Sequence, residues 1–440
     1  MKNKNREIVQ EGTGGLDPSL FSGSSPNVPQ LKEEINKIKA EHGIQAAYNA
    51  LLRIEAALKL RKPTMAIYDH TGHIIGGGQK YGFTVANALQ DIFDITLIVN
   101  KEISLRDILE WYHLDLSKCK IKLIEIPFFE QFDSRQLDPG RISRRMENPF
   151  HIISKESGNY DFFINNSMNE MVYPLSNIST VICHFPERRP NSFFYTDRYT
   201  HVIYNSKYTA HWIEKKWKFT PHKHIYPPVD MAPEKEEKPA KENMILSVAR
   251  FEASGSKKQL EMVKTFLKLN RRFPGILKEW KLVIAGGSPG ENDYLKKVKE
   301  TIEKSGADNI ELKLNIPGDE LKTIYKKSTI FWHLCGLDQT DPSLVEHFGM
   351  TIVEAMQNRL VPIVFDGGGQ REIVEHRVNG FRVQSSAQLM AFTMKVINEP
   401  EIREELSRSA LKRSKAFTRE TFEKNIKEFF TGELQKYLSI

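Results

Sequence analysis

The amino-acid sequence alternates short apolar segments with segments of helical periodicity, and this alternation constrains the fold more than any other feature. The apolar segments of a first run lie at residues 65–69, 95–100, 121–127, 160–167, 180–186 and 201–206. Those of a second run lie at residues 244–249, 281–287, 310–314, 328–334, 361–365 and 380–383. Strands that alternate with helices at this spacing form parallel, doubly wound sheets. We therefore predict an α/β protein with two such sheets.

The stretch between the two runs has the composition of a linker, because it is charged and contains proline (DMAPEKEEKPAKEN, residues 230–243). At 440 residues the chain is also too long for one ordinary hydrophobic core. The predicted parts are an N-terminal arm and helix at 1–62, a Rossmann-like domain at 63–230, a linker at 231–243, a second Rossmann-like domain at 244–405, and C-terminal helices at 406–440 that pack back toward the first domain. Two such domains would face a cleft outside the carboxyl ends of their strands, where open α/β sheets bind ligands.

The N-terminal region differs from the rest of the chain. Residues 11–30 are rich in Gly, Ser and Pro, which predicts a loose arm. Residues 31–60 have helical spacing that Gly43 interrupts and Pro63 ends, so we expect one broken helix or two.

Composition limits the possible partners and compartment. The formal net charge of +7 suits phosphate-bearing ligands or an anionic membrane face, and no nucleic-acid-reading motif accompanies it. The three cysteines are far apart in sequence, as expected of reduced thiols. The polar first residues and the lack of a ~20-residue apolar run predict no signal peptide and no membrane span. We expect a cytoplasmic protein that binds no nucleic acid.

One segment is locally basic and aromatic. It contains Lys207, Trp212, Lys215, Lys216, Trp217, Lys218 and Lys223. A solvated helix face with two anchored tryptophans explains it simply. The alternative is an interfacial patch that brings the protein to lipid-linked molecules at a membrane surface.

The segment EHFGMTIVEAM (346–356) carries the strongest chemical signal. Gly349 opens a helix, so the backbone N–H groups of Met350 and Thr351 are free to bind a diphosphate at the helix N-terminus. Glu354 lies one to two turns into that helix, where it can accept ribose hydroxyls. Glu346 precedes the turn and would face a sugar. Two unrelated surface acids are the alternative, which the apolar helix face and the following VPIVFDGGGQREIV strand and turn disfavour.

A strand-end arginine and a following lysine form a second signal in SVARFEASGSKKQL (247–260). Arg250 and either Lys257 or Lys258 would neutralise a leaving diphosphate. The inserted EASGS leaves the choice of lysine open, and alignment of the following helix favours Lys257. Alone, these residues would be ordinary surface charges.

Two weaker signals lie in the first run. Gly77 and Gly78 belong to a glycine cluster after the first strand, which is a tight turn or a site of close backbone approach to a ligand. Its spacing differs from Gly-x-Gly-x-x-Gly, which argues against NAD. His184, in CHFPE, ends a later strand and would lie near a donor sugar, although a buried structural histidine explains it equally well.

Together these segments resemble the family 4 retaining glycosyltransferases of the GT-B fold, whose signature is Glu-x7-Glu, here Glu346 and Glu354. GGGQKY, HFP, YNSKYTA, IYPPVD and EHFG look closest to the branch with the mannosyltransferases of lipid-linked oligosaccharide assembly. The resemblance implies transfer of a hexose from a nucleotide-diphosphate sugar to a glycan, lipid-linked or other hydroxyl acceptor. It also implies a base pocket near Ile316, with Arg250, Lys257, Glu346 and His184 as catalytic residues.

The implied mechanism is a front-face, oxocarbenium-like step that relies on positioning and on stabilisation of the leaving diphosphate. The sequence has no Asp-x-Asp motif and no His, Cys and carboxylate cluster at ligand spacing. We therefore expect no metal and no cofactor besides the sugar nucleotide as co-substrate.

Three other functions remain as alternatives. A non-catalytic GT-B scaffold would bind a sugar nucleotide without transferring it, and the presence of all the acidic and basic residues named above argues against it. A GT-B epimerase or phosphorylase is a second alternative, and no pyridoxal-lysine signal supports the latter. A Rossmann oxidoreductase is a third, which the missing fingerprint disfavours.

Overall fold

The computed structural model describes residues 28–126, 142–167, 170–230, 240–288 and 290–439. The chain forms two compact units, each treated by itself below. Unit 1 consists of Met1–Tyr204, Trp212–Ile225 and Glu423–Ile440, and unit 2 of Asn205–His211 and Tyr226–Phe422. Most of the predicted linker, residues 231–239, lies outside the described residues.

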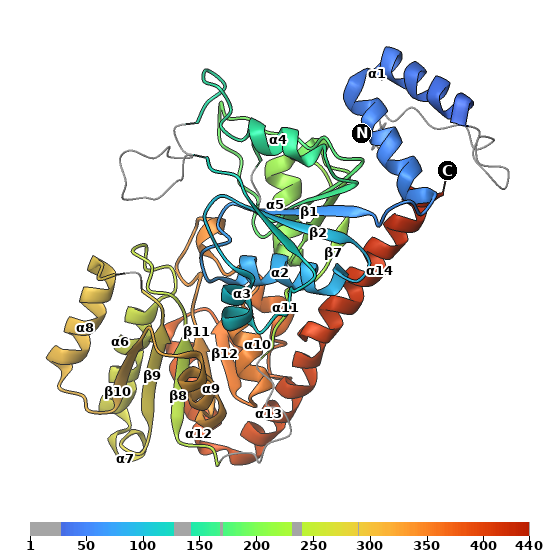
Figure 1. The fold of residues 1–440 in the computed structure, drawn as a ribbon. Helices are drawn as coiled ribbons and strands as arrows, with labels where there is room; N and C mark the ends of the chain where they lie inside the picture. Colours follow the sequence, from blue (N-terminus) through green and yellow to red (C-terminus); the bar gives the residue numbers. More distant parts are fainter. Residues whose placement is uncertain (1–27, 127–141, 168–169, 231–239, 289, 440) are drawn as a thin grey trace, which may run out of the picture. The chain divides into compact units, whose positions relative to one another are not determined.

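Unit 1 is built on a seven-stranded parallel sheet with the order β3-β2-β1-β4-β5-β6-β7 (Figure 1). The strands are β1 Thr64–Asp69, β2 Asp94–Val99, β3 Lys120–Leu123, β4 Phe162–Asn165, β5 Ile178–Cys183, β6 His201–Tyr204 and β7 Lys223–His224. Successive strands run outward in one direction from β1 to β3 and in the other from β4 to β7. The order therefore reverses between β1 and β4, and the carboxyl ends of these two strands form the position where such sheets bind ligands.

Helices flank this sheet in the order that a doubly wound fold requires. They are α1 Val28–Ala57, α2 Gly77–Leu89, α3 Leu105–Tyr112, α4 His151–Ser157, most of α5 Lys207–Trp217 and most of α14 Arg419–Leu438. Aromatic and aliphatic side chains of β1, β4, β5 and β6 pack against α4 and α5, with Phe150, Ile213 and Trp217 buried among them. Gly43 interrupts α1 with φ 89°, ψ 175°, as the sequence predicted. Helix α1 buries a small apolar cluster around Leu31, Ile38 and Ile54.

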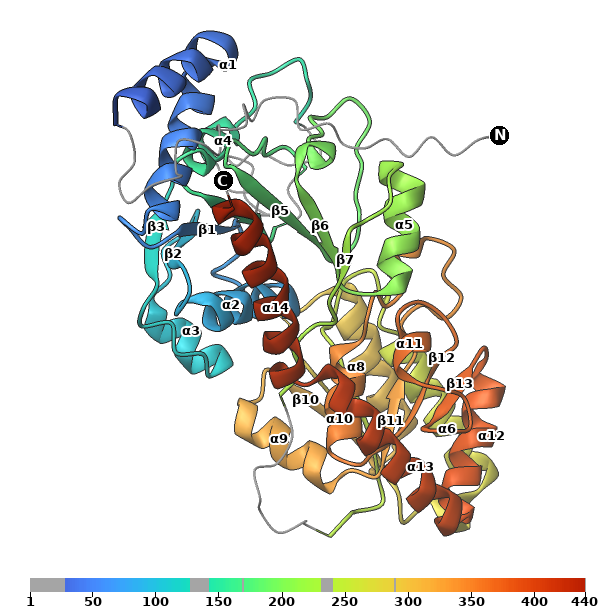
Figure 2. The ribbon, with the colours of Figure 1, turned by 90° about the vertical axis from the view of Figure 1, so that its right-hand side faces the viewer.

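A buried carboxylate ties the end of α14 into unit 1. Asp161, just before β4, is fully buried and accepts hydrogen bonds from Arg61, from Thr64 and from the hydroxyl of Tyr437 on α14. Arg53 of α1 also donates to the Tyr437 carbonyl at 2.7 Å. Figure 2 shows α14 beside the strands of this sheet. The Asp161 charge is compensated by the Arg61 guanidinium, as a buried carboxylate requires.

Unit 2 contains a six-stranded parallel sheet with the order β10-β9-β8-β11-β12-β13. The strands are β8 Met244–Val248, β9 Lys281–Gly286, β10 Ile310–Leu314, β11 Ile330–His333, β12 Val361–Phe365 and β13 Phe381–Val383. The helices are α6 Gln259–Arg272, α7 Pro274–Leu277, α8 Asp293–Ser305, α9 Gly318–Lys327, α10 Met350–Gln357, α11 Gln370–Ile373, α12 Ser386–Asn398 and α13 Pro400–Ser414. Here the order reverses between β8 and β11.

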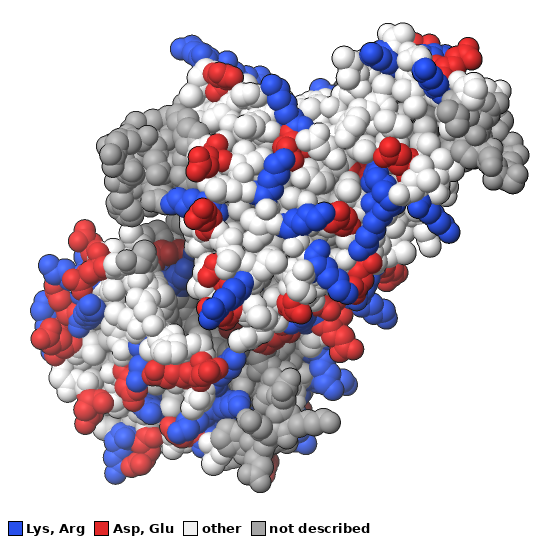
Figure 3. Space-filling model, viewed as in Figure 1, with Lys and Arg blue, Asp and Glu red and all other residues white. Residues whose placement is uncertain are grey.

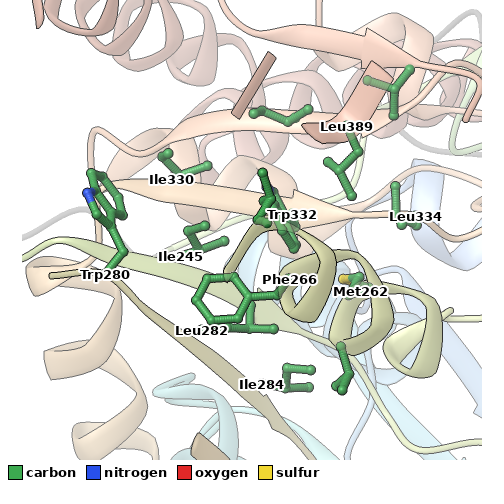
Figure 4. Packing of buried hydrophobic residues seen from close by; sticks show 14 of the residues in the cluster. Ile245, Met262, Phe266, Trp280, Leu282, Ile284, Ile330, Trp332, Leu334 and Leu389 are labelled. Atoms are coloured by element: carbon green, nitrogen blue, oxygen red, sulfur yellow. The ribbon is translucent and has the colours of Figure 1, made fainter. Parts of the chain in front are cut away.

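Alternate side chains of these strands form two cores, one on each face of the sheet. On one face, Phe266 and Met262 of α6 pack against Trp332 of β11 and against Ile245 and Leu282 (Figure 4). On the other face, strand residues pack against α9, α10 and α13. A strand that is buried on both faces has no polar alternation, which is why β8, β11 and β12 appear in the sequence as continuous apolar runs.

The predicted fold class, two Rossmann-like parallel sheets with an N-terminal helix, is confirmed. Helix α10 and strand β12 have the predicted bounds. The sequence pattern missed α9, which begins at Gly318 directly after Pro317 and has mostly polar residues, and the two-residue β7. None of the helices in the described ranges has both the length and the apolar character needed to cross a bilayer.

Candidate functional site

A cluster of polar side chains lies at the reversal point of unit 2. Lys257 follows β8, His333 is the last residue of β11, and Glu346 lies between β11 and α10. The Lys257 Nζ lies 2.9 Å from Glu346 Oε2, and the His333 Nε2 lies 3.0 Å from the same oxygen. The parallel sheet brings these residues together because the carboxyl ends of adjacent strands share one edge.

The charges in this cluster stabilise one another. Burial alone would raise the pKa of Glu346, but the Lys257 ammonium and the His333 donor hold it well below its ordinary value. Burial opposes the charge of Lys257 too, and Glu346 nevertheless raises the pKa of the lysine. Their side chains are only 18% and 17% exposed, so solvent screens the pair weakly. The cluster therefore holds an ionised carboxylate and an ammonium at neutral pH.

Both donors occupy the same carboxylate oxygen of Glu346. No hydrogen bond to Glu346 Oε1 is present among the described residues, and this oxygen is not among the buried unpaired atoms. The carboxylate is thus fixed in orientation by one oxygen while the other can accept a hydrogen bond from a ligand hydroxyl.

A glycine run after β12 supports the backbone of Glu346. The N–H of Gly369 donates to the Glu346 carbonyl at 2.8 Å. A Cβ at Gly368 would collide with that same carbonyl, and one at Gly369 would collide with the carbonyl of His347. Gly368 also has φ 59°, which disfavours any side chain. The glycines of VFDGGGQ therefore permit close packing against the Glu346 segment.

The N-terminus of α10 has the predicted free donors. Gly349, its N-cap, has φ 111°, and a Cβ there would lie 2.7 Å from Ile352 Cδ1. Within the described chain, the backbone N–H groups of Met350 and Thr351 have no hydrogen-bond partner, whereas those of the next two residues donate to the Gly349 carbonyl. Such a terminus binds anions.

Glu354 lies farther along α10 and is held by a buried phenol. The hydroxyl of Tyr325, on α9, donates to Glu354 Oε2 at 2.9 Å. Burial, and secondly the Glu354 charge, raises the pKa of Tyr325, so this phenol stays a donor. Tyr325 was not predicted as a site residue, because the sequence pattern missed α9 and no local motif links this tyrosine to Glu354.

The other predicted donor-binding residues lie near this cluster in sequence but have different surroundings. Arg250 is 70% exposed at its side chain and pairs with Glu252 at 3.0 Å. Lys258 has φ 62° and caps α6. Ile316 lies between β10 and α9 and packs against the core. Beside it, Asn315 exchanges two hydrogen bonds with the backbone of Ser288 after β9, which fixes these two loops to each other.

Unit 1 has a different set of polar groups at its own reversal point. Asp69 ends β1, and Asn166 directly follows β4. The Asn166 Nδ2 donates a hydrogen bond to Asp69 Oδ2 at 2.7 Å. Asn166 also donates to the carbonyl of Gly78 in the first turn of α2. A Cβ at Gly78 would lie 3.3 Å from His184 Nε2, so the glycine allows the helix to approach this histidine. Gly77 begins α2 and is exposed. Asp69 and Asn166 were missed by sequence reasoning, although AIYDH and FINNS end in polar residues as strands at such a site do.

The histidine of unit 1 is held neutral. Burial lowers the pKa of His184 to about 4, and the Asp69 charge opposes this shift only partly. Tyr81 contacts the ring edge-on, at 5.4 Å between centroids. His184 is therefore an uncharged imidazole at neutral pH, which suits contact with a hydroxyl better than with a phosphate.

The basic segment is partly structural. Trp217 is buried and donates to the Glu187 carbonyl at 2.7 Å. Lys216 lies 4.7 Å above the Phe185 ring and Lys215 lies 5.2 Å above Trp212. On the face seen in Figure 3, basic and acidic side chains are interspersed. A separate stretch, residues 130–158, contains Arg135, Arg141, Arg144 and Arg145, which could bind a phosphate-bearing acceptor or belong to an ordinary basic loop. Arg135 and Arg141 lie outside the described residues.

The structure also assembles a cluster that the sequence spacing did not reveal. One potential ligand atom each of His333, Cys335 and Glu346 lies within 4.8 Å of the other two. His333 and Cys335 were missed because FWHLC reads as a buried strand. Only the fold brings this strand end next to Glu346.

Comparison with known proteins finds a match for most of unit 2. Residues 229–413 match the family described as "Glycosyl transferases group 1". The mouse GDP-Man:Man(3)GlcNAc(2)-PP-Dol alpha-1,2-mannosyltransferase is 30% identical over 198 residues, which are 42% of this chain and 38% of the mouse protein. The Dictyostelium discoideum protein of the same name is 25% identical over 240 residues, which are 50% of this chain and 45% of that protein. The chain thus aligns with less than half the length of these relatives.

Solved structures share the fold over most of this chain. Anabaena HepE in complex with UDP-glucose has a TM-score of 0.63 and 16% identity, covering 84% of this chain and 99% of HepE. Sucrose-phosphate synthase from Thermosynechococcus elongatus has a TM-score of 0.61 and 15% identity, covering 86% and 100%. At these identities the likeness establishes the fold, which is of the GT-B type.

Proposed function

Because residues 229–413 match the family described as "Glycosyl transferases group 1", we propose that the chain transfers a hexose from a nucleotide-diphosphate sugar to a hydroxyl acceptor, with retention and without a metal ion. The observation that carries the proposal is the Glu346 carboxylate, held at one oxygen by Lys257 and His333 and open at the other. Next to it in the chain lies the helix N-terminus with the free donors of Met350 and Thr351.

In this proposal the diphosphate binds at the N-terminus of α10. The helix dipole and the two N–H groups favour its negative charge. The Lys257 ammonium stabilises the leaving diphosphate electrostatically, as a pre-positioned charge in a weakly solvated site does. Arg250 and Lys258 would add positive charge near the diphosphate from more exposed positions.

In this proposal Glu346 binds the sugar and Glu354 binds the nucleoside. Glu346 Oε1 would accept a hydrogen bond from a hexose hydroxyl, and Glu354 one from a ribose hydroxyl. The base would lie near Ile316. In this proposal no side chain acts as a covalent nucleophile, and a leaving-group oxygen takes the acceptor proton as the bond to the acceptor forms on the same face from which the diphosphate departs.

The acceptor is assigned to unit 1, where Asp69, Asn166, Gly78 and the neutral His184 provide hydrogen-bonding groups. The names of the mouse and Dictyostelium relatives include GDP-Man as the donor and an oligosaccharide on PP-Dol. On this basis we propose GDP-mannose as the donor and a lipid-linked oligosaccharide as the acceptor. A peripheral contact of the Trp212–Lys216 segment with anionic lipid would be consistent with such an acceptor.

The first test is calorimetric binding of UDP, GDP and ADP to the purified chain in EDTA. Selective binding of one nucleotide, followed by transfer from the matching sugar nucleotides in EDTA, is the expected result. Activity that depends on added Mg²⁺ or Mn²⁺ would contradict the metal-free step. Binding without transfer to any glycan or lipid-linked acceptor would favour a sugar-nucleotide-binding scaffold.

A further inference from the structure

The Lys257 ammonium is held by groups that also suit a metal ion. His333, Cys335 and Glu346 provide nitrogen, sulfur and oxygen ligands within 4.8 Å of one another. Imidazole, thiolate and carboxylate in such a set are the ligands of Zn²⁺ and similar thiophilic divalent ions. The side chain of His333 is 2% exposed and Cys335 is 1% exposed, so these two ligands are held in place by the surrounding core.

We propose that this cluster is an inhibitory site for a thiophilic divalent cation such as Zn²⁺, which competes with Lys257 for Glu346. Binding would place the ion on His333 Nε2, Cys335 Sγ and a Glu346 oxygen, with water at the fourth position. The thiol proton is released to solvent, and the imidazole proton shifts from His333 Nε2 to Nδ1, so that Nε2 can bind the ion. The lysine side chain moves away from the ion that replaces its charge.

The surroundings of each ligand predict a site of moderate strength. The His333 Nδ1 has no hydrogen-bond partner in the described chain, so no outer group fixes the ring for metal binding. Such missing support weakens a metal site about 10- to 100-fold. The Cys335 thiol donates to the Leu344 carbonyl at 3.6 Å, so the ion must also replace this hydrogen bond and displace the thiol proton. Reversible binding follows, rather than a permanent structural ion.

The consequence for activity rests on the proposed function. An ion on Glu346 would remove both the oxygen for the sugar and the lysine for the diphosphate. Zn²⁺ would therefore inhibit transfer and weaken nucleotide binding, and EDTA would restore both. Metal binding can be measured without measuring transfer. An experiment can therefore show that the ion does not bind independently of whether the chain transfers a sugar.

The test is titration of the full chain with Co²⁺, with thiolate-to-cobalt charge-transfer absorption as the readout. We expect the absorption in the wild-type protein, its loss in Cys335→Ser and Cys335→Ala, and its displacement by Zn²⁺. Cys119→Ser is the matched control, since Cys119 is a buried thiol of unit 1 and should leave the signal unchanged. Circular dichroism of each variant checks that it folds.

A second variant examines the competition. Lys257→Met should tighten Co²⁺ binding about tenfold, because it removes a positive charge a few ångströms from the ion. No absorption in the wild-type chain, or absorption that survives both substitutions of Cys335, overturns the proposal. Absorption that appears only in Lys257→Met would show that the lysine excludes the ion, and would also overturn it for the natural chain.

Discussion

The two units use the same sheet position for opposite kinds of chemistry. At the reversal point of unit 2, an ammonium and a carboxylate lie 2.9 Å apart with little exposure to solvent. At the reversal point of unit 1, Asp69 is satisfied by neutral donors, and the histidine nearby is uncharged. The first arrangement is suited to a charged ligand and the second to hydroxyl groups. The shared fold thus determines where a ligand binds, while the residues at the strand ends determine which chemistry is possible.

The largest expected effect comes from removing the charge in unit 2. Lys257→Met should lower kcat about 10²–10³-fold, because a pre-positioned charge at the leaving group is lost. Glu346→Gln should have an effect of similar size, because it removes both the charge that pairs with Lys257 and the carboxylate assigned to the sugar. Steady-state transfer assays measure this effect. Lys299→Met, which breaks an exposed pair with Glu291 in the same unit, should leave kcat unchanged. Near-wild-type kcat in both Lys257→Met and Glu346→Gln would show that the charged pair of unit 2 does not act in transfer, and the contrast with the neutral site of unit 1 would lose its functional meaning.

The next effect concerns the neutral histidine of unit 1. The folded-state pKa of His184 is about 4, below its unfolded value near 6.5, so the unfolded state takes up the proton first. Stability should therefore fall as the pH decreases from 6.5 to 4, by up to about 3 kcal/mol from this group. Denaturant unfolding across that pH range, compared with His184→Gln, measures the contribution.

An exposed histidine provides the control for this measurement. The His151 side chain is 47% exposed. In His151→Gln the free energy of unfolding should depend on pH as it does in the wild-type protein. If the free energy of unfolding of His184→Gln depended on pH as it does in the wild-type protein, the pKa of His184 would not be lowered by folding. Unit 1 would then not be arranged around a neutral imidazole.

The smallest effect tests whether the phenol of Tyr325 orients Glu354. Tyr325→Phe removes one hydrogen bond to a carboxylate, which contributes on the order of 1–2 kcal/mol. Nucleoside diphosphate binding should weaken about 5- to 30-fold in calorimetry. Tyr294→Phe removes a buried hydroxyl that instead accepts from the Leu260 N–H, and serves as the comparison. Equal loss in both variants would indicate a general stability effect.

The sequence predicts the units better than their sites. Continuous apolar runs such as β8 and β12 identify buried parallel strands because both faces of each strand are covered. The Gly349 entry and the apolar face of α10 predict where that helix begins. By contrast, the partners of Glu346 depend on which strands become neighbours. His333 and Lys257 are separated from it by 13 and 89 residues, and no local pattern links them.

Exposure is a second property that the local sequence does not reveal. Arg250 and Lys257 appear equivalent as strand-end cations, but only Lys257 is withdrawn from solvent. The loop between them sets this difference. Asp69 was overlooked for a similar reason, because its importance arises from Asn166, which is 97 residues away.

The hydrogen bond between Tyr437 and Asp161 has a consequence for folding during synthesis. All of unit 2 is encoded before residue 423, and its sheet can close once that stretch has left the ribosome. Unit 1 begins first, yet its buried carboxylate gains the Tyr437 donor only after α14 has emerged. The domain translated first is thus completed last, and chaperones would meet it with part of its surface uncovered throughout elongation.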